Sequence, residues 1–194
     1  MPKYEIVLLD ADDTLFDFKK AEEWALREAF RLRGRDLTGE AAAAYEEINA
    51  SLWRRLERGE LDQRTIRSER FRLLFERLGI GEDPGAFGEL YVDRLSIAAF
   101  LLEGAEALCA RLSATRRLAI VTNGIAEVQK SRLARSPIAR FIEKAIVSEE
   151  VGSAKPDPAI FAKALELLGA TDKSRVVMVG DSLASDIKGG IAFG

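Results

Sequence analysis

The stretch that decides the fold is Tyr4-Glu5-Ile6-Val7-Leu8-Leu9-Asp10-Ala11-Asp12-Asp13-Thr14-Leu15. Its first half is a short, continuous apolar run, which is typical of a strand that is buried on both faces of a parallel sheet. Its second half places three acids directly behind that strand. Ligands of open parallel sheets bind beyond the carboxyl ends of the strands, so we expect a functional site at this edge.

Between residues 16 and 95, apolar residues recur with the spacing of helices instead of forming a continuous run. Asp17 is suited to cap a first helix. The expected helix ends are Gly34, Gly59 and Gly79, the expected turn is 81–85, and a fourth helix is expected over 86–95. Because none of these segments has the pattern of a strand, we predict a helical unit inserted after the first strand.

Helical and strand patterns alternate beyond Phe100. The expected strands are 118–121, 145–147 and 176–179, and the expected helices are 105–112, 126–134 and 157–169. Asp157-Pro158 would begin the last helix, as an N-cap followed by proline at the first helical position, and Gly169 would end it. Repeated strand–helix units of this length predict an α/β fold with a doubly wound parallel sheet.

The composition is that of an ordinary globular protein, with 194 residues, 47% of them hydrophobic and 31% charged, and a net charge of −3. This charge balance argues against a nucleic acid polymer or an anionic membrane as partner. No apolar run reaches membrane-spanning length and the N-terminus lacks a signal-peptide pattern, so we expect a cytoplasmic protein. The sequence leaves the oligomeric state open.

The chain contains no histidine and a single cysteine, Cys109. Histidine-dependent catalytic triads, phosphohistidine chemistry and histidine-ligated zinc are therefore excluded. Cys109 lies in an apolar helical pattern, so we expect it to be buried rather than nucleophilic. Any polar chemistry must depend on carboxylates, lysines, hydroxyls and backbone amides.

Every expected strand ends in residues that suit a metal ion or a phosphate group. They are Asp10, Asp12 and Thr14 after the first strand, Thr122, Asn123 and Gly124 after the second, Lys155 in the loop after the third, and Gly180, Asp181, Ser182, Ser185 and Asp186 after the fourth. Loops at strand ends are commonly polar, which explains any one of these groups but explains all four poorly.

The acids Asp10, Asp12, Asp181 and Asp186 would meet at one edge of the sheet. Their mutual repulsion makes such a cluster unfavourable unless a cation neutralises it. Ligation by oxygen alone favours Mg²⁺. Calcium is the alternative metal, although an Asp-x-Asp that ends a strand is not an EF-hand loop.

Thr122, Asn123 and Lys155 would form the anion-binding side of the same site. A strand-to-helix turn offers a hydroxyl and backbone N–H groups, and a lysine adds a compact positive charge. Positioning and charge neutralisation are what phosphoryl transfer requires. We therefore expect Asp10 to attack phosphorus as a nucleophile, and Asp12 to serve as general acid and then general base.

Four ordered motifs resemble those of the haloacid dehalogenase superfamily. They are Asp10-Ala11-Asp12-Asp13-Thr14-Leu15, Val121-Thr122-Asn123, Lys155-Pro156, and Gly180-Asp181-Ser182 through Asp186. The resemblance implies a Rossmann-like core of residues 1–15 and 96–194, with an inserted helical cap domain over 16–95. Members of the family continue past Gly194 into a further strand and helix, so we expect a missing edge strand and lowered stability or association at that edge.

The resemblance also implies roles for single residues. Asp10 would be the nucleophile and Asp12 the acid/base. Mg²⁺ would be held by Asp10, Asp181 and the Asp12 carbonyl, and phosphate by Thr122 and Lys155. Thr14, Ser182 and Asp186 would support them, and Ser182 is equally suited to cap the following helix.

Three neighbourhoods are similar to the pyrimidine 5′-nucleotidase subgroup. They are 10–18, Ser51-Leu52-Trp53 with Gly59 and Arg70-Phe71, and Val147-Ser148-Glu149-Glu150-Val151-Gly152. This similarity implies a small-molecule phosphate ester, a nucleoside 5′-monophosphate, as substrate. The alternatives are a sugar phosphatase or phosphomutase, and a noncatalytic phosphate-binding protein, which would need neither Asp10 nor Asp12.

Aromatic residues offer two further expectations. Trp53, Phe71 and Phe75 are spaced as in a helix, so we expect them to pack in the core of the cap rather than on a nucleobase. Phe16 and Phe18 directly follow the acidic loop, and we expect them to line the substrate entrance.

Overall fold

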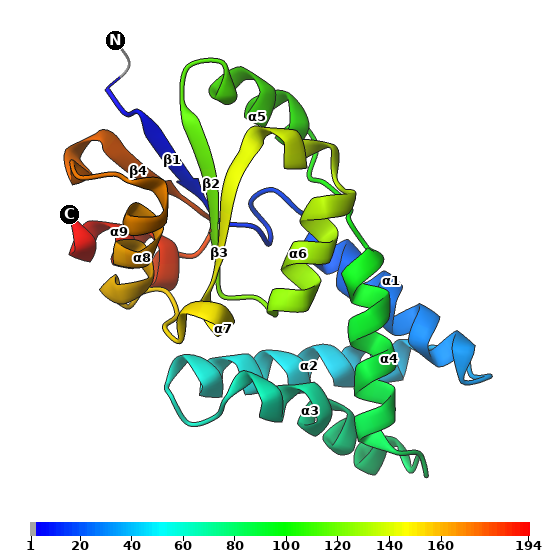
Figure 1. Cartoon of the computed structure of the whole chain (residues 1–194). Helices are drawn as coiled ribbons and strands as arrows, with labels where there is room; N and C mark the ends of the chain where they lie inside the picture. The colour runs from blue at the N-terminus through cyan, green and yellow to red at the C-terminus, as the bar shows by residue number, and fades with distance from the viewer. Residues whose placement is uncertain (1–2) are drawn as a thin grey trace. The chain divides into compact units, whose positions relative to one another are not determined.

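Four parallel strands form the sheet in the computed structural model, which describes residues 3–194 (Figure 1). They are β1 (Ile6–Leu9), β2 (Arg117–Thr122), β3 (Ile142–Val147) and β4 (Val176–Val179). Their order is β3-β2-β1-β4, so the first strand lies in the middle of the sheet. The predicted parallel sheet is confirmed, although β3 begins three residues before the expected position.

Helices cover both faces of this sheet. They are α5 (Ala105–Ser113), α6 (Ala126–Arg135), α7 (Ser148–Val151), α8 (Pro158–Leu168) and α9 (Lys188–Phe193), with 3₁₀ turns η1 (Pro137–Phe141) and η2 (Lys173–Arg175) and a π turn η3 (Leu183–Ile187). Alternate residues of β1 face opposite ways, as the pleat of a strand requires. Ile6 and Leu8 pack with α8, whereas Val7 and Leu9 pack with α5. The predicted doubly wound α/β fold is confirmed.

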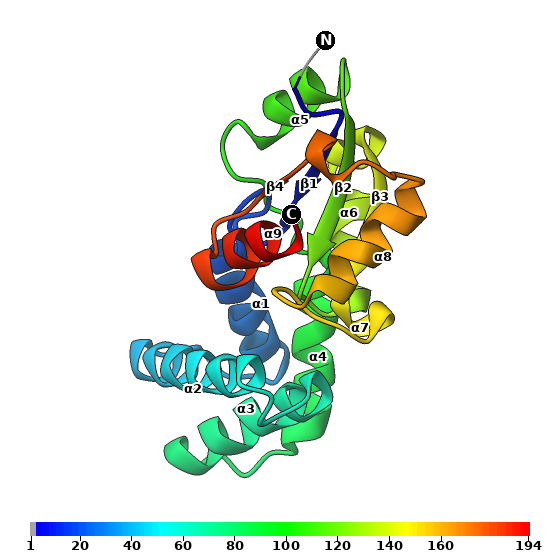
Figure 2. The same ribbon diagram turned by 90° about the vertical axis from the view of Figure 1, so that its left-hand side faces the viewer.

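The segment after β4 is helical, as the capping role suggested for Ser182 implies, although the local sequence does not define its bounds. Its glycines, Gly189 and Gly190, disfavour a helix by propensity. Tertiary packing accounts for Gly189, because a Cβ there would lie 2.7 Å from Cε2 of Phe161 on α8. Figure 2 shows α9 beside α8, and the Phe161 and Phe193 rings stack with centroids 5.7 Å apart.

The chain divides into two compact units, one comprising Ala21–Ala98 and the other the remaining residues up to Lys20 and from Ala99. The helical unit, as we call Ala21–Ala98, contains most of α1 (Phe18–Leu32) and all of α2 (Gly39–Glu57), α3 (Gln63–Leu78) and α4 (Pro84–Ile97). Among residues 3–194, no helix is both long and apolar enough to cross a membrane.

Local capping determines where these helices begin. Asp17 accepts a hydrogen bond from the backbone N–H of Lys20 at 3.0 Å, which confirms it as a cap of α1. Asp83 accepts from the N–H of Gly85 at 2.9 Å, with Pro84 at the first helical position. Helix α4 therefore begins within the expected 81–85 turn, two residues before the predicted start.

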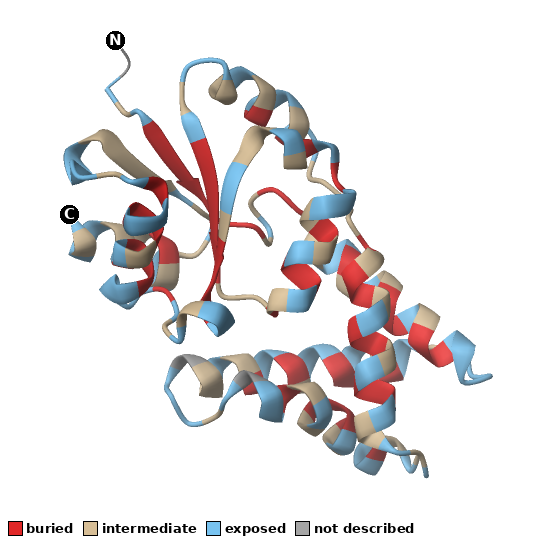
Figure 3. Ribbon diagram, viewed as in Figure 1, coloured by how far each residue is buried: buried red, intermediate tan, exposed pale blue. Residues whose placement is uncertain are grey.

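An aromatic cluster forms the core of the helical unit, which Figure 3 shows as buried faces on its helices. Its members are Phe30 of α1, Tyr45 of α2, Phe71 and Phe75 of α3, and Phe87 and Tyr91 of α4. Phe71 lies at its centre, 4.9 Å from the Phe87 ring centroid and 5.3 Å from that of Tyr91. The core positions predicted for Phe71 and Phe75 are confirmed, whereas Trp53 is only half-buried.

Candidate active site

Polar residues from four strand ends meet at the carboxyl edge of the sheet. Asp10 directly follows β1, Thr122 ends β2, and Asp181 lies two residues after β4. Parallel pairing aligns these ends, since Leu9 is in register with both Ile120 and Val179. The loop after β3 and α7 adds Lys155. The predicted set of strand-end residues is thus assembled in one place by the sheet.

Lys155 binds two carboxylates at once. Its Nζ lies 2.5 Å from Oδ1 of Asp10 and 2.6 Å from Oδ1 of Asp186, and it also donates to the carbonyl of Val121 at 2.7 Å. All three side chains are buried. Burial raises the pKa of Asp10 to about 6, and the ammonium group of Lys155 opposes part of that rise. The lysine thus keeps two desolvated acids close together.

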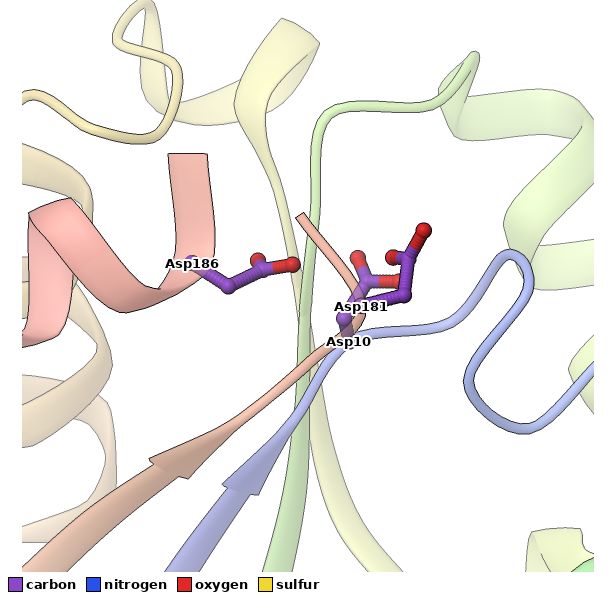
Figure 4. Close-up of side chains that lie close together, drawn as sticks. All are labelled: Asp10, Asp181 and Asp186. Carbon is purple, nitrogen blue, oxygen red and sulfur yellow. The ribbon is translucent and has the colours of Figure 1, made fainter. Parts of the chain in front are cut away.

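Asp10, Asp181 and Asp186 form what we call the carboxylate cluster. Each offers an oxygen within 4.8 Å of the others, and Figure 4 shows Asp186 extending toward the other two side chains. Asp186 reaches this position because Gly180 has no side chain. A Cβ at residue 180 would lie 2.2 Å from Oδ2 of Asp186. That carboxylate is held further by the backbone N–H of Ser182 at 3.0 Å.

The carboxylate cluster suits a hard divalent cation. Three carboxylates and the ammonium group of Lys155 leave two negative charges, which a divalent ion would neutralise. The donors are all oxygens, and the chain has no histidine. Mg²⁺ prefers such ligands and is commonly bound through one or two carboxylates, with water completing its shell. The donor set therefore fits the Mg²⁺ expected from the sequence.

Asp12 is the one of the four predicted acids whose side chain lies outside the carboxylate cluster. Both of its carboxylate oxygens are hydrogen-bonded to helix α6. Arg132 donates to Oδ1 and Gln129 donates to Oδ2, each at 2.6 Å. The metal contact predicted for Asp12 is made by its backbone carbonyl oxygen, which neither of these side-chain hydrogen bonds involves.

Gln129 and Arg132 are contacts that sequence reasoning missed. They are spaced i, i+3 on the helix that follows Thr122-Asn123-Gly124, and both are buried despite being polar. Burial distinguishes these two residues from the other polar residues of α6. The sequence around them has the pattern of an ordinary charged surface helix, so it does not predict this burial. Only the packing of α6 against the loop after β1 reveals them.

Asn123 positions Lys155 through the backbone. Its Oδ1 accepts from the N–H of Lys155 at 2.8 Å, and its Nδ2 donates to the Lys155 carbonyl at 2.9 Å. The side-chain hydroxyl of Thr122 accepts from the N–H of Gly124 at 3.1 Å, which leaves the O–H to donate. Thr122 and Lys155 both lie at the carboxyl edge of the sheet, and their phosphate contacts stay predictions, while the side-chain amide of Asn123 supports the lysine.

The predicted supporting residues have distinct environments. The hydroxyl oxygen of Thr14 is buried and has no hydrogen-bond partner among residues 3–194. Ser182 accepts from the N–H of Ser185 at 3.2 Å, so its side chain caps η3, one of its two expected roles. Asp13 is an exposed turn residue with a φ of 56°, a left-handed conformation that aspartate tolerates better than most residues.

Phe16 is a correction to the sequence analysis. It is 0% exposed and packs with Leu15 and Cys109 in the core between the sheet and α5. A ring buried in this way cannot line a substrate entrance. Phe18, at the start of α1, is half-buried, and its predicted role at the entrance stays a prediction. Cys109 is buried, as expected.

Comparison with known proteins identifies a family over almost the whole chain. A family model described as haloacid dehalogenase-like hydrolase matches residues 4–194. The pyrimidine 5′-nucleotidase YjjG of Escherichia coli is 34% identical over 192 residues, which cover 99% of this chain and 84% of that protein. The pyrimidine 5′-nucleotidase PynA of Streptococcus pneumoniae is 30% identical over 188 residues, which cover 96% and 79%.

A solved structure shares the fold closely. It is that of YfnB from Bacillus subtilis, named as a HAD-hydrolase, and it is 34% identical with a TM-score of 0.93. The match covers 100% of this chain and 85% of that one. That crystal form is described as bound to magnesium and as revealing interdomain movement.

Proposed function

Because the chain belongs to the haloacid dehalogenase-like hydrolases, we propose that it is a Mg²⁺-dependent phosphomonoester hydrolase with Asp10 as its nucleophile. The observation that carries this proposal is the arrangement at the end of β1. Asp10 lies there with Lys155 at 2.5 Å and with two further carboxylates, and a second acid, Asp12, follows two residues later. A site that only binds phosphate needs neither acid.

The proposed reaction has two steps that balance without any other reagent. A carboxylate oxygen of Asp10 attacks phosphorus, the ester P–O bond breaks, and the leaving alkoxide takes a proton from Asp12. Water then attacks the aspartyl phosphate, the P–O bond to Asp10 breaks, and the proton lost by water returns to Asp12. Inorganic phosphate leaves, and both acids are restored.

Lys155 and Thr122 are proposed to bind the phosphoryl oxygens. The ammonium group of Lys155 holds the nucleophilic carboxylate in place, and the O–H of Thr122, at the end of the neighbouring strand β2, is available as a donor. Asp10, Asp181 and Asp186, with the Asp12 carbonyl, are proposed to hold Mg²⁺, which when bound would neutralise negative charge on the transferred group. Residues 16–95 are proposed to act as the cap that selects the substrate.

The proposed substrate is a nucleoside 5′-monophosphate. The support is similarity to two pyrimidine 5′-nucleotidases over nearly the full chain. A sugar phosphatase or phosphomutase with the same core is the alternative. The proposal includes no nucleic acid polymer and no membrane as partner.

A phosphate-release screen across nucleoside monophosphates and sugar phosphates, with and without EDTA, tests this function. We expect release to need a divalent ion and to be fastest with a nucleoside monophosphate. Asp10→Asn should lower kcat by at least about 10³-fold, because the nucleophile is lost. Metal-independent release, or full activity of Asp10→Asn, would refute the mechanism. Preference for a sugar phosphate would refute the substrate.

A further inference from the structure

The carboxylate of Asp12 is held at both oxygens by one helix. Arg132 Nη1 donates to Oδ1 and Gln129 Nε2 donates to Oδ2, each at 2.6 Å. The two donors are one helical turn apart on α6, so they approach the carboxylate as a pair. Such a pair fixes both the position of the carboxylate and its rotation about the last side-chain bond. The Asp12 side chain remains 25% exposed, which leaves part of it open to a reacting group.

The environment of Arg132 argues against a purely structural role. Its side chain is 0% exposed, and its guanidinium group lies 4.5 Å from the Phe16 ring centroid and 5.9 Å from that of Phe18. Its Nε and Nη2 have no hydrogen-bond partner among the described residues. A buried cation with unsatisfied N–H groups is costly, and apolar residues of similar volume commonly stabilise such a position better. The arginine at this place is therefore better explained by its effect on Asp12.

Gly124 provides the space that Gln129 needs. A Cβ at residue 124 would lie 2.2 Å from Nε2 of Gln129, the same atom that donates to Asp12. The backbone of Gly124 is not in the left-handed region, so close approach rather than conformation explains the glycine. The strand-end turn and the helix thus act together on one carboxylate.

We propose that Arg132 and Gln129 are positioning residues that orient Asp12 for proton exchange with the leaving group. This inference rests on the proposed function, in which Asp12 is the general acid. Arg132 and Gln129 do not touch the substrate. They act through Asp12, because each donates to a different oxygen of its carboxylate and together they restrict it to one orientation.

The test compares two phosphate esters that differ in how much protonation their leaving groups need. A nucleoside monophosphate or an alkyl phosphate expels an alkoxide, which requires a proton, whereas p-nitrophenyl phosphate expels a phenolate that leaves without one at neutral pH. The measured quantity is kcat/KM, which for a covalent mechanism reports steps up to loss of the leaving group. In Arg132→Lys and Gln129→Leu, we expect kcat/KM to fall about 10- to 100-fold for the alkyl ester, and by less than about threefold for p-nitrophenyl phosphate.

Two further variants keep the test decisive if Arg132→Lys folds poorly. Gly124→Ala should displace Gln129 and produce the same selective loss. Lys130→Gln is the matched control, because Lys130 lies on the same helix in an exposed ion pair with Glu150 and should leave both esters unchanged. Arg132→Lys in an Asp12→Asn background should cause no additional loss, since it acts only through Asp12.

The outcomes separate this inference from the proposed function. In one outcome, Asp12→Asn lowers kcat/KM selectively for the alkyl ester, but Arg132→Lys, Gln129→Leu and Gly124→Ala lower it equally for both esters. This outcome would overturn the positioning role alone. If Asp12→Asn itself affects both esters equally, Asp12 is not the general acid, and both the assigned role and the inference fail.

Discussion

Lys155 shows how a single residue organises the site. It connects Asp10 to Asp186, which come from opposite ends of the sequence, and its own backbone is held by the side-chain amide of Asn123. Its charge lowers the electrostatic cost of burying Asp10 but does not remove it, since burial still raises the pKa of Asp10 to about 6. The nucleophile therefore retains a measurable pH dependence.

Binding of Mg²⁺ should weaken in acid because protons compete for Asp10. A carboxyl group with a raised pKa is protonated below about pH 6, and a protonated ligand binds the cation poorly. We expect the affinity for Mg²⁺ to fall about tenfold between pH 7 and pH 5 as the ionised fraction of Asp10 falls. Isothermal titration calorimetry at the two pH values measures this change.

The same raised pKa makes the stability of the metal-free protein depend on pH in the opposite direction. The pKa of Asp10 is raised above its ordinary value of 3.8, so folding favours the protonated form. The contribution of Asp10 to stability is therefore greatest below about pH 4 and declines as the pH rises through about 6. An affinity for Mg²⁺ that is unchanged between pH 5 and pH 7 would contradict a raised pKa for this ligand.

At the scale of elements, the sequence predicted the central parts of strands and helices better than their ends. Apolar runs identified all four strands, and caps such as Asp17 and Asp157 marked helix starts. The turn at 81–85 was extended too far, because the pair Asp83-Pro84 begins a helix that glycine at residue 85 does not prevent. The bounds of the helix after β4 were not predicted, since Gly189 in it is explained by close packing against α8 and not by local propensity.

Gly180→Ala should disturb the carboxylate cluster through the end of one strand. A Cβ at residue 180 would lie 2.2 Å from Oδ2 of Asp186, so the side chain of Asp186 must move. We expect the affinity for Mg²⁺ to fall about 10- to 100-fold. Gly81→Ala is the matched control, because a Cβ there meets nothing within 4 Å. Equal affinities in Gly180→Ala and the wild type would show that Asp186 does not need its present position.

At the scale of the whole molecule, the chain contains two units with separate cores. The carboxylate cluster, Lys155 and the Gln129–Arg132 pair all belong to the unit that contains the sheet. The aromatic cluster around Phe71 belongs to the helical unit. Each unit therefore has its own source of stability, and only one of them contains the proposed metal ligands.

Mg²⁺ should stabilise the two units unequally. At a free concentration of 100 times its Kd, a ligand that binds only the folded state adds about 2.7 kcal/mol to the free energy of unfolding. We expect this gain in the slowest-exchanging amides of β1 and β2, and little change in those of α3. Hydrogen exchange with and without Mg²⁺ measures both, and Asp10→Asn should abolish the difference. Equal slowing in α3 and in the sheet would contradict separate stabilisation.

The sequence by itself determined the fold class, the four strand-end motifs and the family. The reason is that the spacing of apolar residues and of acids along the chain is a local property, which can be seen without knowing how distant segments pack. The tertiary structure alone decided three other features. It placed the Asp12 side chain outside the carboxylate cluster, it buried Phe16 in the core, and it brought Gln129 and Arg132 onto Asp12. The physical reason is that each depends on contacts between segments far apart in the chain, such as α6 and the loop after β1, whose packing no local pattern records.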